Sequence, residues 1–202
     1  NPPTTKANTG YEFGTWDKDA TRPTIYADEV TTIKARFNGF KDVIPKTNPD
    51  GSENKKPEGY KTVTFVIDPS TGGKIADKEV TVYYVNPDKE VTVPQPKTQA
   101  DTGYEFEKWN QDTATKAKKY DKDITVKGNF KNLDDIIDGN KPKPDGYVTV
   151  TFDKGEHGTL NGQKVYYVNP KANKTIADLT KPKVKPETGF KFTKWDTEDS
   201  FQ

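Results

Sequence analysis

The chain has 202 residues, balances 32 basic side chains against 31 acidic ones, and contains neither cysteine nor methionine. The missing cysteine excludes disulfides, thiolate metal sites and a cysteine nucleophile. Leucine, isoleucine, valine and phenylalanine make up only about 18% of the residues, which is close to the composition of disordered chains, but the low net charge and the 11% aromatic content favour folding. We therefore expect small folded units and not one large core.

The kinds of apolar and charged residue narrow the class further. Valine and isoleucine together number 24 against 3 leucines, and β-branched residues favour strands. Lysine supplies 30 of the 32 basic residues and is interleaved with acids, so no basic stripe for nucleic acid is formed. No apolar run is long enough to span a membrane, and no leader or sorting signal is visible. We predict a mainly β protein with no nucleic-acid partner and no transmembrane segment.

Internal repetition is the strongest feature of the sequence. One phrase reads Thr-Gly-aromatic-x-Phe-x-x-Trp, a second Tyr-Tyr-Val-Asn-Pro, and a third Gly-Tyr-x-Thr-Val-Thr-Phe. The first phrase occupies residues 9–16, 102–109 and 188–195. The second occupies residues 83–87 and 166–170, and the third occupies residues 59–65 and 146–152. Their spacing predicts a repeat unit of about 85 to 93 residues.

The repeats divide the chain into five predicted parts. Residues 1–44 are the C-terminal part of a first repeat, 59–138 are a complete repeat, and 146–202 are the N-terminal part of a third. Residues 45–58 and 139–145 separate them and carry turn residues and prolines without apolar periodicity, which is typical of linkers.

In chain order, the complete repeat opens with a predicted hairpin. Apolar residues alternate over 63–67, as in a strand with one buried face. After a glycine-containing turn, alternation resumes over 80–84 with Val80, Val82 and Tyr84 on one face. Two such strands separated by a turn are expected to pair with each other.

A proline-rich crossover follows, because Pro94 and Pro96 cannot donate hydrogen bonds to a central ladder. The matching stretch of the third repeat, residues 173–179, favours one or two helical turns. Four short strands with one interrupted crossover are thus expected to form a small, half-exposed sheet in each repeat.

The third predicted strand begins at Tyr104, which shares a face with Phe106. Trp109 lies three residues beyond Phe106 instead of two, so a bulge or chain reversal must turn its indole toward the core. The closing strand is predicted over residues 124–130.

This order of elements resembles the internalin B-repeat family, also called the Listeria–Bacteroides repeat, found in wall-anchored surface proteins of Gram-positive bacteria. The resemblance covers Gly59 to Phe130 and both partial copies, with an inserted run between Trp109 and Asp123. It implies an α+β, β-grasp (ubiquitin-like) fold in tandem repeats joined by proline-rich linkers. It also implies an extracellular location, at the bacterial cell wall or surface, in long adhesins.

Candidate catalytic and metal-binding residues are sparse. The lone histidine, His157, lies in a glycine turn without converging partners, and the three serines lie in loop-like sequence without a nucleophile elbow. Acidic or amide residues recur after each Trp and could offer oxygen ligands to Ca²⁺, but without calcium-loop spacing; they are Asp17, Asp19, Asn110, Asp112, Asp196 and Glu198. We read Asp134, Asp135 and Asp138 as charge beside a linker. We therefore predict no catalytic residue, no cofactor and no metal site.

The recurring aromatic residues have two interpretations. We predict that they anchor the core of each repeat, because a small polar domain has few other large side chains to bury. An exposed surface that stacks against sugars is the alternative. The predicted core of the complete repeat consists of Tyr104, Phe106, Trp109, Phe65, Tyr84 and Phe130.

Two functions compete. In the first, the repeats form a non-catalytic stalk that holds a distal binding domain away from the bacterial cell wall. In the second, they directly bind a host extracellular protein or glycan, for instance by lending a strand edge. The segment Val30 to Phe37 matches the closing strand that residues 146–202 lack, which predicts strand exchange within one chain or between chains. The alternative is that the natural protein continues on both sides of these residues and completes the end repeats itself.

Overall fold

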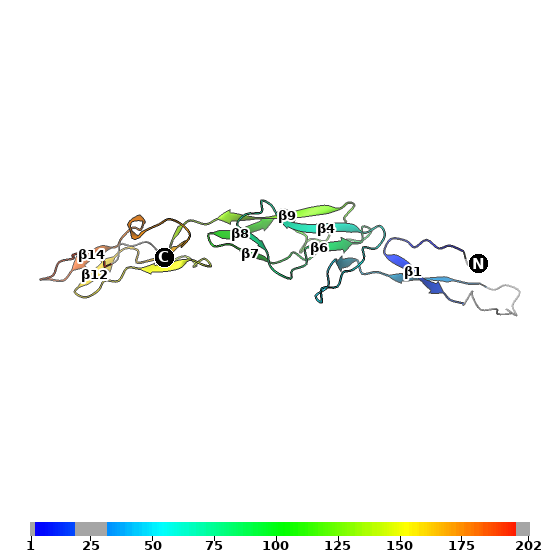
Figure 1. Ribbon diagram of the computed structural model, residues 1–202, viewed down its shortest axis with the longest axis horizontal. Coiled ribbons are helices and arrows are strands. Elements are labelled where there is room, and N and C mark those ends of the chain that lie inside the picture. The colour runs from blue at the N-terminus through cyan, green and yellow to red at the C-terminus, as the bar shows by residue number, and fades with distance from the viewer. Residues whose placement is uncertain (1–2, 19–31, 197–202) are drawn as a thin grey trace. The chain divides into compact units, whose positions relative to one another are not determined.

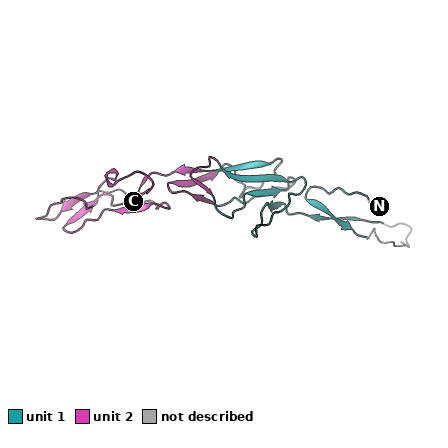
Figure 2. Ribbon diagram, in the orientation of Figure 1, with its two compact units in different colours: residues 1–67, 75–97, 109–128 teal, residues 68–74, 98–108, 129–202 magenta. Residues whose placement is uncertain are grey.

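The computed structural model describes residues 3–18 and 32–196 of the chain. These residues form short β-strands and one turn of 3-10 helix, η1 (Ile176–Asp178), without an α-helix among them (Figure 1). The predicted mainly β class is confirmed. The chain separates into two compact units (Figure 2): residues 1–67, 75–97 and 109–128, and residues 68–74, 98–108 and 129–202.

The first sheet of unit 1 is an antiparallel pair formed by β1 (Tyr11–Trp16) and β2 (Ala35–Gly39). Its register shifts between Phe13 and Thr15. This irregularity is the bulge that the Phe-x-x-Trp spacing predicts, because one extra residue returns the tryptophan to the face of the phenylalanine.

The second sheet of unit 1 has the order β3-β6-β4-β9. Its strands are β3 (Val43–Pro45), β4 (Lys61–Ile67), β6 (Val82–Val85) and the first half of β9 (Ile124–Asn132). β4 pairs antiparallel with β6, as the predicted hairpin requires, and parallel with β9, with Val63 opposite Ile124. The predicted closing strand is therefore confirmed.

The second half of β9 lies in unit 2 beside β8 (Tyr104–Trp109). Phe106 and Phe130 pack edge to face with ring centroids 5.4 Å apart, and Lys131 pairs with Glu105 at 2.6 Å. A Cβ atom at Gly73 would lie 2.4 Å from the Phe130 ring. β5 (Gly73–Ile75), which pairs with β7 (Thr98–Ala100), therefore begins at a residue that must be glycine.

The rest of unit 2 holds the third repeat. Its sheet has the order β10-β13-β11, and β12 pairs separately with β14. The bounds are β10 (Ile136–Asp138), β11 (Val148–Thr151), β12 (Gly158–Asn161), β13 (Val165–Val168) and β14 (Lys183–Pro186). η1 confirms the short helical turn predicted in residues 173–179, and Thr175 and Asp178 close it with a capping box.

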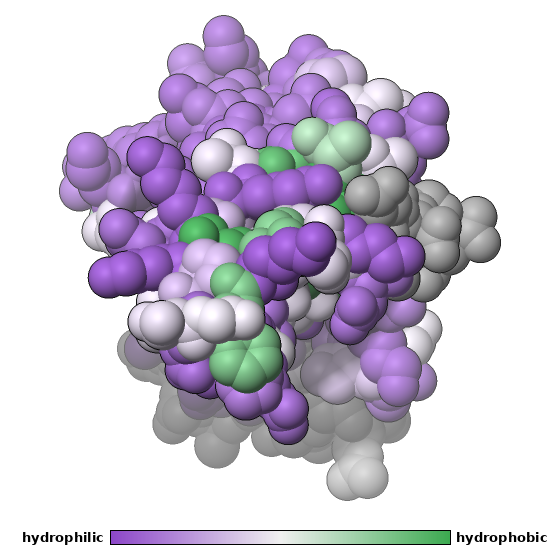
Figure 3. All heavy atoms as spheres, turned by 90° about the vertical axis from the view of Figure 1, so that its left-hand side faces the viewer, coloured by the Kyte–Doolittle hydropathy of each residue, from purple (hydrophilic) through white to green (hydrophobic). Residues whose placement is uncertain are grey.

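The second and third repeats each have a small apolar core, whereas Tyr11 and Phe13 of the first copy are exposed, so the expectation that the recurring aromatic residues anchor a core in every copy is wrong there. The cluster in unit 1 comprises Val63, Phe65, Tyr83, Val85, Val91, Val93, Tyr120 and Val126, and that in unit 2 comprises Phe152, Tyr166, Val168 and Leu179. A tryptophan packs edge to face on the equivalent phenylalanine in both: Trp109 on Phe65 at 5.2 Å, and Trp195 on Phe152 at 4.9 Å. Figure 3, which faces the end with β12 and β14, shows how much of the surface is hydrophilic.

Two irregular segments cover the unit 1 core, and the sequence signals did not reveal this role. Val93 in the proline-rich crossover is fully buried. Its amide donates to the carbonyl of Thr113 at 2.7 Å, and the Thr113 hydroxyl donates back to the Val93 carbonyl at 2.9 Å. Tyr120, from the inserted run, is also buried. These two segments of extended chain thus cover one face of the second sheet of unit 1.

Of the predicted core residues, Phe65 and Trp109 belong to the cluster of unit 1, whereas Phe106 and Phe130 pack against each other in unit 2. Phe65 and Phe130 are buried and Tyr104, Phe106 and Trp109 are half-buried, but the tyrosine in the core cluster is Tyr83 and not Tyr84. Tyr84 lies on the opposite face of β6, opposite Ile44 and Thr62. The sequence predicts the facing of β6 from Val80, but the strand begins only at Val82. Val80 therefore does not determine which residues of β6 face the core.

The predicted pairing of Val30 to Phe37 with the third repeat is not formed within the chain, so far as these residues are described. Residues 30 and 31 lie outside the described part, and Ala35–Gly39 pairs with β1. The third copy of the Thr-Gly-aromatic phrase also differs from the other two, because residues 190–195 form no strand. Exchange between chains stays a prediction.

We expect Trp109→Ala to lower the free energy of unfolding by about 3 kcal/mol, because it removes a large ring from the cluster around Phe65. Trp16→Ala is the matched control, since Trp16 lies in the separate β1–β2 sheet. Thermal melting of the 202-residue chain should show a clear downward shift for the first variant and little for the second. Equal melting curves for Trp109→Ala and the parent chain would contradict the core assignment.

Candidate functional site: the junction between repeats

Successive repeats are joined by strand addition. β3, at the end of the first repeat, pairs antiparallel with β6 of the second, with Val43 opposite Val85. β10, at the end of the second repeat, pairs in the same way with β13 of the third, with Ile136 opposite Val168. The predicted ends of two repeats at residues 44 and 138 therefore fall in strands that are hydrogen-bonded to the following repeat. Each junction lies within one unit.

A buried asparagine fastens the first junction. The backbone amide of Asn86 donates to the Asp42 carbonyl at 2.9 Å, and its side-chain Nδ2 donates to Asp42 Oδ1 at 2.9 Å. Asn86 Oδ1 accepts from the Asp88 amide at 3.1 Å. With only 4% of the residue exposed, these contacts satisfy both ends of an amide that is otherwise costly to bury.

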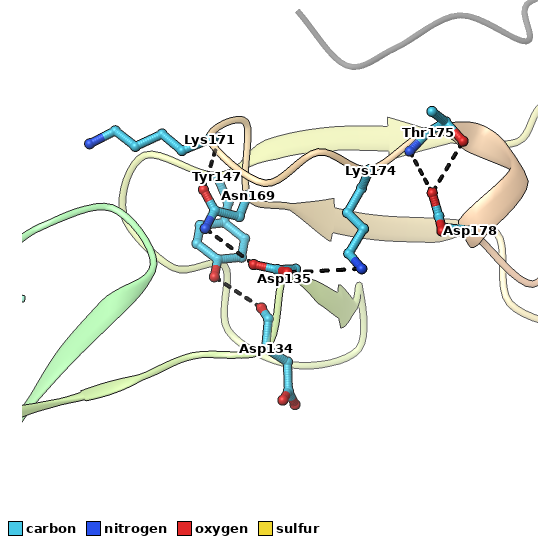
Figure 4. Close-up of polar contacts among 8 residues, drawn as sticks. All are labelled: Asp134, Asp135, Tyr147, Asn169, Lys171, Lys174, Thr175 and Asp178. Atoms are coloured by element: carbon cyan, nitrogen blue, oxygen red, sulfur yellow. Dashed lines mark hydrogen bonds and ion pairs between the residues drawn. The ribbon is translucent and has the colours of Figure 1, made fainter.

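The second junction repeats this arrangement (Figure 4). The amide of Asn169 donates to the Asp135 carbonyl at 2.8 Å, and its Nδ2 lies 3.5 Å from Asp135 Oδ1. Asn169 Oδ1 accepts from the Lys171 amide at 3.0 Å. Lys174 adds an ion pair with Asp135 at 4.0 Å. Asp135, predicted to be charge beside a linker, is instead a junction residue, as is Asp42.

A buried tyrosine holds the chain just before each aspartate. Tyr60 donates its hydroxyl to the Lys41 carbonyl at 3.1 Å, and Tyr147 donates to the Asp134 carbonyl at 2.9 Å. Burial raises the pKa of the Tyr60 hydroxyl, and the carboxylate of Asp42 raises it further. Burial and then the nearby aspartates raise the pKa of Tyr147 in the same direction. Both hydroxyls therefore keep the proton that they donate.

The Thr-Gly dipeptide of the repeated phrase belongs to the same junctions. Gly10 and Gly103 adopt φ values of +90° and +93°, which favour glycine. A Cβ atom at Gly10 would lie 2.9 Å from Asn86 Nδ2, and one at Gly103 would lie 2.7 Å from Asn169 Nδ2. The phrase is therefore constrained by the asparagine of the next repeat, a role that sequence reasoning missed.

The polar residues that follow Trp16 and Trp109 accept hydrogen bonds from backbone amides. Asp17 Oδ1 accepts from the Lys34 amide at 2.7 Å, and Asn110 Oδ1 accepts from the Lys127 amide at 2.9 Å. Asp112 accepts from the amide of Thr115 at 3.0 Å. Asp19 and Glu198 lie outside the described residues. Side-chain oxygens considered as cation ligands thus serve as acceptors for backbone amides.

The lone histidine takes part in packing. His157 stacks on Phe190 with ring centroids 3.8 Å apart, and its Nδ1 lies 3.5 Å from a carboxylate oxygen of Glu187. The two rings border a cavity of about 420 Å³ that Phe192 and Trp195 also line. Phe190 is 52% exposed, so part of the recurring aromatic set is accessible in the third repeat.

Neither a metal cluster nor a membrane span is found in residues 3–18 and 32–196. No three His, Cys, Asp or Glu side chains converge there as metal ligands would. Within the same ranges, no helix has the length and apolar character needed to cross a membrane.

We expect Gly103→Ala to destabilise the chain by about 1 kcal/mol more than Gly189→Ala. Both positions have positive φ, and so share the strain of an added Cβ, but no atom lies within 4 Å of a Cβ at Gly189. Alanine at 103 must displace the Asn169 amide. Urea denaturation followed by circular dichroism measures the difference, and equal losses would show that the asparagine can yield freely.

We also expect stability to decline as the pH rises above about 10, the ordinary pKa of tyrosine. Because folding raises the pKa values of Tyr60 and Tyr147, the unfolded chain releases these protons first. The stability that the two protonated hydroxyls contribute is therefore present below that pH and lost above it. A Tyr60→Phe, Tyr147→Phe double variant should lose less stability between about pH 9 and about pH 11. Thermal melting across this range tests it; parallel losses in the two chains would be the contrary result.

Comparison with known proteins finds a family that the middle of the chain resembles. Residues 62–131 match the family model of the Listeria-Bacteroides repeat domain, while no curated protein and no solved structure matches the chain. The family is a bacterial repeat domain typical of surface proteins and generally non-catalytic. The match runs from β4 to β9 and confirms for the middle repeat the resemblance expected from the sequence. Residues 62–131 are thus similar to the Listeria-Bacteroides repeat domain.

Proposed function

We propose that the chain is a non-catalytic spacer region of a bacterial surface adhesin, in which strand addition restrains each repeat against the next. The observation that supports this proposal is the duplication of the junction: β3 with β6 and β10 with β13 share register, an Asp–Asn pair and a tyrosine hydroxyl bond. A stalk that presents a distal domain needs such restraint, because flexible linkers would let the repeats collapse onto one another.

The pattern of repetition also supports a spacer. Some of the residues that recur lie where they hold the repeats together, Phe65 and Phe152 in cores and Gly10 and Gly103 at junctions, although the recurring aromatic residues Tyr11, Phe13, Phe190 and Phe192 are exposed. An extracellular location at the bacterial cell wall or surface fits a chain without cysteine or methionine, the two side chains most readily oxidised there. The parallel pairing of β4 with β9 is the arrangement that a β-grasp-like repeat requires, and we extend the proposal to that fold.

Backbone ¹⁵N relaxation of the 202-residue chain tests the restraint at the first junction. We expect the β1–β2 pair and the β4–β6 pair to show the same R2/R1 ratio, because Asp42 and Asn86 tie them into one tumbling body. An Asp42→Ala, Asn86→Ala double variant should lower the ratio in β1–β2 selectively. Asp42→Asn, which keeps an oxygen acceptor for Asn86 Nδ2, is the matched control and should behave as the parent does.

The parent chain itself provides the decisive contrary outcome. If β1–β2 already tumbles independently of β4–β6 in the unmodified protein, the junction does not restrain the repeats. The spacer proposal would then lose the observation on which it rests.

A further inference from the structure

The chain enters the second sheet of unit 1 at one end of its strands and leaves it at the other. β3 and β4 both pair antiparallel with β6, and β4 pairs parallel with β9, so β3, β4 and β9 run in one direction. Figure 1 shows β6, β4 and β9 side by side. The first repeat is attached at the start of β3, and the chain continues toward the third repeat from the end of β9. Tension along the chain therefore pulls β3 and β9 in opposite directions.

Tension of this kind loads the sheet in shear. The hydrogen bonds between strands cross from one strand to the next, so sliding one strand along its neighbour strains all the bonds of the pair together. Peeling the strands apart from one end would strain the bonds one at a time. β4 and β9 are joined from Val63 opposite Ile124 to Ile67 opposite Gly128. Because forced unfolding is governed by the rate of unfolding, loading these bonds together raises the force that the pair withstands.

Polar side chains hold the strands at the points where this sliding would begin. The contacts between Asp42 and Asn86 stand just before β3, where the tension enters the sheet. Just before β9, Asp123 Oδ1 accepts from the amide of Thr62 at 2.7 Å and lies 3.5 Å from Lys56 Nζ. The hydrogen bond from Thr62 and the charge of Lys56 lower the pKa of the Asp123 carboxyl. The carboxylate therefore stays charged and ties the start of β9 to β4.

The linkers between repeats do not carry this tension. Residues 46–60 join β3 to β4, but β6 lies between these two strands and is hydrogen-bonded to both. Residues 139–147 join β10 to β11, and these strands flank β13 in the same way. The strands on either side of each linker are thus held by a third strand. Neither linker is stretched while that strand keeps its hydrogen bonds.

We propose that the chain carries mechanical tension through its sheets in shear, and that residues 46–60 and 139–147 are reserve length released only when a junction fails. This proposal rests on the spacer function proposed above and adds the load that the spacer withstands. The junction is the first point to fail, because β3 and β10 have three residues each and the ladder of β4 with β9 is longer. The buried cluster of unit 1 begins at Val63, so release of β3 lengthens the chain before this cluster opens.

Single-molecule pulling of the 202-residue chain tests the direction of loading. The chain contains no cysteine, so two introduced cysteines at exposed positions determine where the handles attach. Lys41→Cys with Asn132→Cys pulls β3 and β9 in opposite directions. Lys41→Cys with Asp121→Cys is the matched control, because both handles then lie at the same end of the parallel strands and peel them apart. We expect a severalfold higher rupture force in the first chain.

The extension of the first chain tests the reserve length. We expect a step of about 5 nm as residues 46–60 straighten and a later one of about 20 nm as the sheet opens, since an extended residue spans about 3.5 Å. An Asp42→Ala, Asn86→Ala double variant should lower the force of the first step selectively. Asp123→Ala should lower that of the second step, whereas its matched control Asp121→Ala should leave it unchanged.

Equal rupture forces in the two attachment geometries would overturn the proposal, as would extension of residues 46–60 before any rupture. The two geometries keep every junction contact, so their comparison decides the matter even where the double variant fails to fold. Relaxation of the unloaded chain reports whether the repeats are restrained, whereas pulling reports whether that restraint withstands force. A chain that tumbles as one body but ruptures equally in both geometries would leave the spacer function intact and overturn only the load-bearing role.

Discussion

A buried asparagine amide at each junction determines which strand lies beside it. Asn86 and Asn169 are removed from water, and an unsatisfied buried amide costs about 1–3 kcal/mol. Each therefore needs an acceptor from the preceding repeat, and Asp42 or Asp135 supplies it. This need fixes the strand that carries the aspartate beside β6 or β13. The repeat boundary is thus held by polar geometry as much as by apolar burial.

The short strands beside the asparagines gain stability from this arrangement. β3 and β10 have three residues each, and so few ladder bonds would hold an isolated segment only weakly. The tyrosine hydroxyl before the aspartate and the asparagine amide on its partner strand secure each segment at its start. The glycine of the Thr-Gly phrase follows from the same geometry, because any side chain there would meet the asparagine.

Sequence reasoning predicted the elements whose signal is local. The alternation in β4, the Phe-x-x-Trp bulge in β1 and the closing strand β9 each show a period or a spacing within a few residues. The pleat phase of Tyr83 and Tyr84 was wrong because two adjacent tyrosines satisfy either face of a strand. The junction was missed because β3 is too short for a period, and because the partners Asp42 and Asn86 are 44 residues apart in sequence.

Similarity between the copies therefore has two physical sources that the sequence alone does not separate. Phe65 and Phe152 recur because each receives a tryptophan ring in its own core. Gly10 and Gly103 recur for a different reason, since the atom that excludes a side chain there belongs to the next repeat. Glycine at these positions also suits its own turn, because its φ is positive, and the asparagine adds a second reason for glycine where another repeat follows. The presence of this glycine in the most specific phrase of the unit means that the sequence encodes the connection between repeats together with the repeat.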